Sequence, residues 1–124
     1  MSWIAVATGG AVGSLFRYAL ALLANQAGWP LGTWLANVIG SFLIGVLAVW
    51  GKERGMFAPE LYLLFATGVM GGFTTFSTLS LEVVTFWGEG QFGRGFLYLA
   101  ASVVVGLLSC AAGIWLARQL PLSA

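Results

Sequence analysis

The sequence contains no histidine and no aspartate, and its four acidic residues are all glutamates. Histidine is the commonest ligand for transition metals in proteins and the side chain whose charge changes nearest to neutral pH. Without it, and with the glutamates scattered along the chain, we find no nucleophile–base pair and do not expect an enzyme. The run 9-GGAVGS-14 lacks the Gly-Lys-Ser/Thr ending of a phosphate loop, so we interpret it as a packing segment.

Charged residues are also scarce. They make up 7% of the 124 residues, against about 25% in soluble domains. Hydrophobic residues make up 60%, and the mean hydropathy is +0.95. So little polar surface cannot cover a fold in water, so we predict an all-α integral membrane protein in contact with a lipid bilayer. The net charge of +1 gives no electrostatic case for nucleic acid. Cys110 is the only cysteine, which excludes a disulfide within the chain.

Four apolar segments are long enough to cross a bilayer, at about 3–24, 31–50, 61–87 and 96–117. A membrane helix needs about 20 mostly apolar residues. The short connections between the segments hold the glycine, proline and charges expected outside the hydrocarbon. We therefore predict a single transmembrane domain over residues 1–124, with four helices. No positive region precedes the first segment, so we expect it to be retained rather than cleaved as a signal peptide.

The third segment carries an interruption, 68-GVMGGFTTFSTL-79. At about 27 residues, the segment is longer than a straight crossing requires. Gly71-Gly72 followed by Thr74-Thr75 favours a helix broken in its middle, because glycine lowers helix propensity and hydroxyls bond freed backbone groups. Such a break survives at membrane depth only inside protein or beside a wet cavity. Half-helix carbonyls at a break can hold a cation, which needs no histidine or aspartate.

The distribution of basic residues leaves the orientation of the chain open. Four crossings place Lys52, Arg54 and Arg118 on one side, against Arg94 and, if it reaches outward, Arg17 on the other. Because the excess of Lys and Arg sets orientation, so weak a bias allows insertion in both directions. Two oppositely inserted copies could then pair about an axis in the membrane plane. The alternative is one orientation decided by the depth of a single arginine.

Polar residues within the spans suggest an anion path. Thr33, Asn37 and Ser41 share one helix face, and Asn37 serves equally well as a transport-path residue or as a hydrogen bond between helices. Phe76 is followed by the hydroxyls of Ser77 and Thr78, with Leu79 next. The positive edge of an aromatic ring, hydroxyl protons and an amide are donors without full charge. Together they suit a small dehydrated anion.

Two ionisable residues lie within the predicted spans. Glu82 follows the hydroxyl cluster by about one turn, and a buried carboxylate needs a partner or a proton. Arg17 ends the glycine face of the first helix. A contact of Arg17 with backbone, a contact with Glu82 and an anion-attracting role in a vestibule are all open at this point.

Three motifs carry a family resemblance: 9-GGAVGSLFRY-18, 32-GTWLANVIGSFLIG-45 and 71-GGFTTFSTLSLE-82. In this order, in a four-helix chain of this length, they resemble the Fluc (CrcB) family of fluoride channels. The resemblance implies an antiparallel, dual-topology homodimer in the bacterial inner membrane. It implies two pores that export fluoride passively, which lowers its toxicity.

The resemblance also assigns roles to residues. It implies a structural sodium ion held by backbone carbonyls of Gly71 and Thr74 from both subunits. It implies supporting or vestibule roles for Arg17 and Glu82. The fluoride pore residues that it implies are Asn37, Phe76, Ser77, Thr78 and Leu79, with Tyr98 and Ser102 on the fourth helix. The family commonly has a second phenylalanine at the place of Leu79, so this sequence lacks one ring edge of the pattern.

Two other classes of membrane protein share some of these features. A small multidrug exporter is also a four-helix, dual-topology dimer, but its proton exchange needs a carboxylate in the first helix, where this chain has none. A non-transporting scaffold would use small residues such as Gly9, Gly13, Gly32 and Gly40 for assembly. It would leave Asn37 and the hydroxyl-rich break without a purpose.

Overall fold

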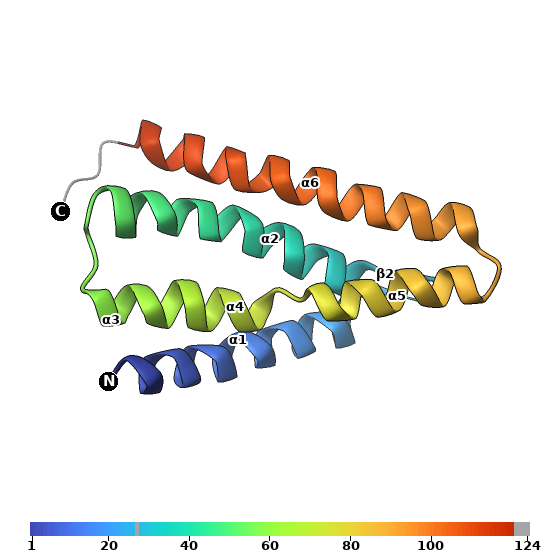
Figure 1. Ribbon diagram of the computed structural model, residues 1–124, viewed down its shortest axis with the longest axis horizontal. Helices are drawn as coiled ribbons and strands as arrows, with labels where there is room; N and C mark the ends of the chain where they lie inside the picture. The colour runs from blue at the N-terminus through green and yellow to red at the C-terminus, as the bar shows by residue number, and fades with distance from the viewer. Residues whose placement is uncertain (27, 121–124) are drawn as a thin grey trace.

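The computed structural model describes residues 1–26 and 28–120 and is a set of long helices laid side by side (Figure 1). Within the described residues, four helices are long and apolar enough to cross a membrane. The first is α1, and the second is α2 continued by the π-helix η1. The third runs through α3, the π-helix η2, α4 and α5, and the fourth is α6. Their bounds are Ser2–Ala24 for α1, Leu31–Leu47 for α2, Ala48–Glu53 for η1, Pro59–Tyr62 for α3, Leu63–Met70 for η2, Gly71–Phe73 for α4, Phe76–Gly88 for α5 and Phe92–Gln119 for α6.

The connections between the spans are short. A two-residue antiparallel pairing of β1 (Asn25–Gln26) with β2 (Trp29–Pro30) joins α1 to α2. Gly28 has a φ of +93° in this turn, a conformation open to glycine at little cost. The Asn25 side chain then accepts hydrogen bonds from the backbone N–H groups of Gly32 and Thr33, at 2.6 and 3.3 Å. These bonds satisfy two of the donors that the start of α2 leaves without helical partners.

The first helix packs against the first half of the third span through bare backbone. A Cβ atom added at Gly9 would lie 2.8 Å from the Cα of Gly68, and one at Gly13 would lie 2.8 Å from the amide nitrogen of Phe73. Only glycine permits this approach, which confirms the expected packing role of both positions. Membrane helices associate through such small-residue seams because lipid offers no hydrophobic driving force between them.

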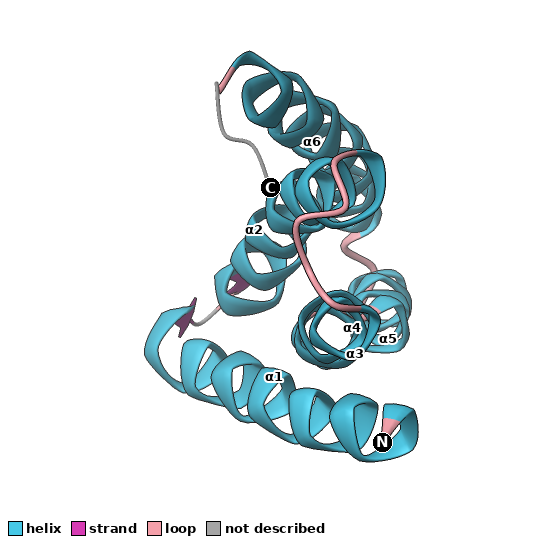
Figure 2. Cartoon of the chain, turned by 90° about the vertical axis from the view of Figure 1, so that its left-hand side faces the viewer, coloured by secondary structure: helices cyan, strands magenta, loops and turns pink. Residues whose placement is uncertain are grey.

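The third span changes neighbours along its length. Its first half, η2 and α4, packs on α1, whereas α5 packs on α6. Figure 2 shows α1 on one side of the third span and α6 on the other side of the molecule. A small buried cluster joins the second half to α6 and consists of Leu79, Val83, Phe86 and Tyr98. The break between α4 and α5 therefore lies where the span passes from one packing partner to the other.

Helices α2 and α6 form the other close seam. A Cβ at Gly45 would collide with the carbonyl oxygen of Cys110, and one at Gly113 would collide with that of Phe42. At the end of the bundle that holds the N-terminus and the last turn of α6 (Figure 1), Arg118 pairs with Glu53 across the same two spans. This seam holds α2 and α6 as one wall beside the break.

Candidate functional site

The third span is broken at two threonines. Thr74 has φ −89° and ψ 156°, and Thr75 has φ −153° and ψ 118°, so both are extended between the end of α4 and the start of α5. The break predicted from the Gly-Gly and Thr-Thr pairs is confirmed, and it spans the threonines rather than the glycines. Gly71 and Gly72 belong to α4.

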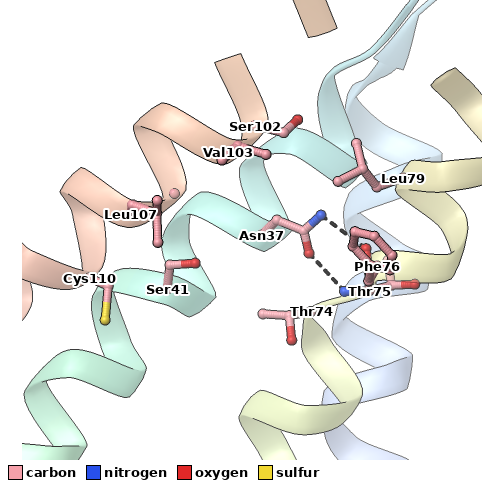
Figure 3. Close-up of a pocket in the computed structure, with 11 residues that line it drawn as sticks. Asn37, Ser41, Thr74, Thr75, Phe76, Leu79, Ser102, Val103, Leu107 and Cys110 are labelled. Carbon is pink, nitrogen blue, oxygen red and sulfur yellow. Dashed lines mark hydrogen bonds between the residues drawn. The ribbon is translucent and has the colours of Figure 1, made fainter. Parts of the chain in front are cut away.

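Asn37 holds the break in place. Its side-chain oxygen accepts a hydrogen bond from the Thr75 backbone N–H at 2.7 Å, and its side-chain nitrogen donates to the Thr75 carbonyl at 3.1 Å. Figure 3 shows the amide turned toward the break, with both bonds drawn. One amide thus pairs with both backbone groups of an extended residue, as a neighbouring β-strand would. At membrane depth this matters because unpaired backbone groups are costly there.

Thr75 is the centre of a hydroxyl cluster. Its side chain accepts a bond from the Thr78 backbone N–H at 3.2 Å and so caps the start of α5. The same hydroxyl donates to the Thr78 hydroxyl at 3.1 Å and lies 3.3 Å from that of Ser77. The sequence indicates Thr75 only as part of the helix break and not as a cap or site residue, although a threonine just before an apolar helix is a start signal.

The break releases carbonyl groups from helical pairing. In a continuous helix the Thr75 N–H would pair with the Gly71 carbonyl, and the Thr78 N–H with the Thr74 carbonyl. Here the first donor bonds to Asn37 and the second to the Thr75 hydroxyl. The Gly72 carbonyl between them accepts a bond from the side chain of Arg17 at 3.0 Å. Arg17 therefore makes the backbone contact, one of the contacts that the sequence left open.

A groove of about 420 Å³ runs beside the break, between α2, α5 and α6. Its lining includes Asn37, Phe76 and Ser102 and carries no charged side chain among the described residues. The Ser102 side chain is 7% exposed, and its hydroxyl has no hydrogen-bond partner within the described residues. Phe76 is 77% exposed, so its ring stands at the surface of the single chain. Leu79 is 6% exposed and belongs to the buried cluster as well as to the groove wall.

Glu82 lies about one turn further along α5 and binds two neighbours. The buried Tyr98 hydroxyl donates to its carboxylate at 3.1 Å, and the buried Thr33 hydroxyl donates at 3.3 Å. Glu82 also lines a second groove of about 570 Å³, together with Arg94 near the α5–α6 turn. Arg94 lies 5.3 Å above the Trp29 ring.

The structure thus brings most of the predicted residues to one stretch of the molecule. Thr33, Asn37 and Ser41 follow one another on α2, and Tyr98 and Ser102 face them from α6. Ser77 and Thr78 join Asn37 through Thr75. The polar groups thus form two layers along the helices. Asn37 and Ser102 lie at the level of the break, and Glu82 and Tyr98 lie further along α5 and α6.

Comparison with known proteins gives a consistent result. The family described as "CrcB-like protein, Camphor Resistance (CrcB)" matches residues 4–114. A protein of Caulobacter vibrioides (strain NA1000 / CB15N) named "Fluoride-specific ion channel FluC" is 43% identical over 118 residues, which cover 92% of this chain and 93% of the relative. Proteins with the same name from Roseobacter denitrificans and Roseiflexus sp. (strain RS-1) are 42% identical over 122 residues and 41% identical over 124. These alignments cover 94% and 98% of this chain, and 95% and 100% of the relatives.

Proposed function

The chain belongs to the CrcB family, and we propose that it is a fluoride-selective ion channel, not an enzyme, which exports fluoride passively across a bacterial inner membrane. The relatives that are named fluoride-specific ion channels cover nearly the whole chain. The observation that carries the proposal is the uncharged groove at the break, which gathers an amide, hydroxyls and an aromatic ring. Fluoride enters an uncharged path only if protein donors replace its water, and leaves only if none binds too strongly.

The Ser102 hydroxyl supports this assignment most directly. A buried hydroxyl without a hydrogen bond is costly, and such groups in native proteins call for an explanation. Ser102 lines the groove from α6, beside Asn37 of α2. A turn of this side chain toward the groove would give its O–H an anion as partner. The Asn37 amide has two N–H protons and gives one to Thr75, so the other can serve the same ion.

The exposed Phe76 ring supports a dimer of oppositely inserted copies. An aromatic ring that is 77% exposed beside a hydroxyl cluster would be completed by a second chain. In the proposed dimer two pores run antiparallel, and the ring edge of Phe76 stabilises fluoride as a weak donor. Ser77 and Thr78 contribute hydroxyls at the same level. Leu79 keeps the wall apolar without adding a second ring edge.

The released carbonyls at the break fit a structural sodium ion. The donors that would pair with Gly71 and Thr74 in a helix are bonded elsewhere, and oxygen ligands of this type suit a hard cation. Gly71 and Thr74 line a groove of about 270 Å³ on the face of the chain away from α1. We propose that these carbonyls from two subunits hold the ion. Its charge would stabilise the junction of the two breaks.

Glu82 and Arg17 have supporting roles in this proposal. Arg17 fixes the Gly72 carbonyl and so holds the end of α4. Glu82 orients the hydroxyls of Thr33 and Tyr98, the next polar layer on the path.

Fluoride release from proteoliposomes, followed with a fluoride electrode, tests the proposal. We expect rapid release down its gradient when potassium and valinomycin carry the balancing charge. We expect no comparable chloride release, and no change when a protonophore collapses the proton gradient. Dependence on a proton gradient would favour the small multidrug exporter class instead. An absence of release would leave the non-transporting scaffold.

Separate measurements test the dimer and the ion. In a Cys110→Ser chain with Glu89→Cys in the α5–α6 turn, an impermeant thiol reagent applied outside should label about half of the copies, because half face each way. Labelling of all or none would refute dual topology. Sodium, but not N-methylglucamine, should raise the melting temperature of the purified protein, because a ligand bound only to the native state stabilises it. Equal melting temperatures in the two cations would refute the sodium site.

A further inference from the structure

Two contacts hold the side chain of Arg94 in the second groove. Arg94 lies in the first turn of α6 and lines the groove of about 570 Å³, as do Glu82 and Glu89. Its guanidinium lies 5.3 Å above the Trp29 ring, and its Nη1 donates to the Gly28 carbonyl at 3.4 Å. Because a cation is attracted to the face of an aromatic ring, the connection between α1 and α2 positions this charge at the groove.

No carboxylate neutralises this guanidinium. Glu82 and Glu89 line the same groove, yet the one ion pair within the described residues lies at the opposite end of the bundle. The Glu82 carboxylate accepts from two hydroxyls instead. A guanidinium has five N–H donors, and Arg94 gives one of them to a backbone carbonyl. A full positive charge and several donors therefore remain for a solute in the groove.

The groove adjoins the polar layers of the proposed path. Glu82 lines it and also accepts the hydrogen bonds of Thr33 and Tyr98, the layer next to that of Asn37. An anion that enters from the end of the bundle with the α5–α6 turn (Figure 1) passes this groove before it reaches the break. Two carboxylates in the lining repel such an anion. Among the described residues of the lining, Arg94 is the only basic side chain that offsets this repulsion.

We infer that Arg94 is an anion-collecting site, which draws small hydrated anions into this groove and so supplies the fluoride path. The inference rests on the proposed function for its second part, the supply of the path. A positioned charge raises the local concentration of counter-ions, and salt screens the effect. Because the attraction depends on charge alone, Arg94 sets how fast fluoride arrives and does not choose between fluoride and chloride. That choice belongs to the uncharged donors at the break.

The potential in the groove is measurable without fluoride. Gln91 also lines the groove and precedes Arg94 by three residues, a spacing that places helical Cβ atoms about 5–6 Å apart. In a Cys110→Ser chain with Gln91→Cys, the rates of thiol modification by an anionic 2-sulfonatoethyl and a cationic 2-(trimethylammonium)ethyl methanethiosulfonate are compared. Their ratio cancels changes in thiol ionisation, because both reagents react with the thiolate. Arg94→Gln should lower the anionic-to-cationic ratio about fivefold at about 10 mM ionic strength, and less than about 1.5-fold at about 1 M.

Fluoride efflux from proteoliposomes tests the second part. At about 10 mM ionic strength, Arg94→Gln should lower the initial rate about threefold, and about 1 M salt should remove the difference. Arg94→Lys should keep most of the native rate because it keeps the charge, and neither variant should release chloride. The matched control is Lys52→Gln. Lys52 also lies over an aromatic ring, that of Tyr62 at 5.7 Å, but does not line this groove, so its loss should change neither the reagent ratio nor the efflux.

Each outcome decides one part of the inference. A reagent ratio that Arg94→Gln leaves unchanged overturns the anion-collecting site, as does an equal fall in Lys52→Gln. A lowered ratio with native efflux overturns the supply of the path. A loss of efflux that salt does not reverse, or that Arg94→Lys shares, also overturns it, because Arg94 would then only hold the connection between α1 and α2. If native protein releases no fluoride, the proposed function fails, and the reagent rates still decide whether Arg94 attracts anions.

Discussion

Replacement of Asn37 by leucine tests how the break is held. Leucine has a similar size but makes no hydrogen bond, so the Thr75 N–H and carbonyl lose their 2.7 and 3.1 Å partners. A buried polar group left without its partner costs about 1–3 kcal/mol. Because the Thr75 groups are only partly buried, we take the lower figure, about 2 kcal/mol for the two. This free energy would shift the equilibrium between the conformation with Thr75 held in place and one with it released about 30-fold toward the released form, at about 1.4 kcal/mol per tenfold.

The assay is the initial rate of fluoride release per protein from proteoliposomes. We expect Asn37→Leu to reduce it at least about tenfold. Asn37→Asp should also conduct poorly, because it can still accept from the Thr75 N–H but places an oxygen against the Thr75 carbonyl. The control is Ile39→Leu, a volume-conserving change on the exposed side of α2, in protein that elutes as one species. Native rates from well-folded Asn37→Leu would show that the break does not depend on this amide.

Three further predictions follow from the same geometry. Phe76→Leu should lower fluoride efflux about tenfold through loss of the ring edge, and equal efflux from native and Phe76→Leu protein would refute the role of the ring. Leu79→Phe should still conduct but should melt at a lower temperature, since overpacking a buried site costs about 1–3 kcal/mol. Gly13→Ala should lower the melting temperature because the new methyl meets the backbone of η2 and α4. Gly10→Ala, with open space at its Cβ, should be neutral or slightly stabilising. A lower melting temperature for Gly10→Ala than for Gly13→Ala would contradict the packing of α1 on the third span. Ser102→Ala should leave the melting temperature unchanged or raise it, since no bond to a described residue is lost and a buried unpaired hydroxyl is removed. It should still reduce efflux about two- to tenfold, and unchanged efflux would remove Ser102 from the path.

The spans and the break could be predicted from the sequence because each depends on local composition. Long apolar runs define the crossings, and Gly71-Gly72 before Thr74-Thr75 marks the discontinuity. The fourth helix begins at Phe92 rather than near 96, since interfacial residues can extend a helix beyond its apolar core. The π-helical turns of η1 and η2 have no signal in the sequence that we can identify.

The contacts of the site could not be predicted, because they join residues far apart in the chain. Asn37 reaches Thr75 across 38 positions, and Arg17 reaches Gly72 across 55. Composition shows that these side chains need partners but not which backbone groups they find. The exposure of Phe76 and the burial of Leu79, three residues apart, likewise depend on how α5 lies against α6. The roles of these residues in fluoride passage stay predictions.

The bonds from Asn37 to both sides of the Thr75 peptide backbone also bear on kinetics. An alternating-access carrier needs a joint that swings in every turnover, and interrupted helices commonly serve as that joint. Here Asn37 of α2 hydrogen-bonds to the break, the Thr75 side chain caps the start of α5, and Arg17 of α1 bonds to the end of α4. Because these contacts hold the break, we expect fluoride to pass without a conformational cycle, at a rate that responds to heating only as weakly as diffusion in water does.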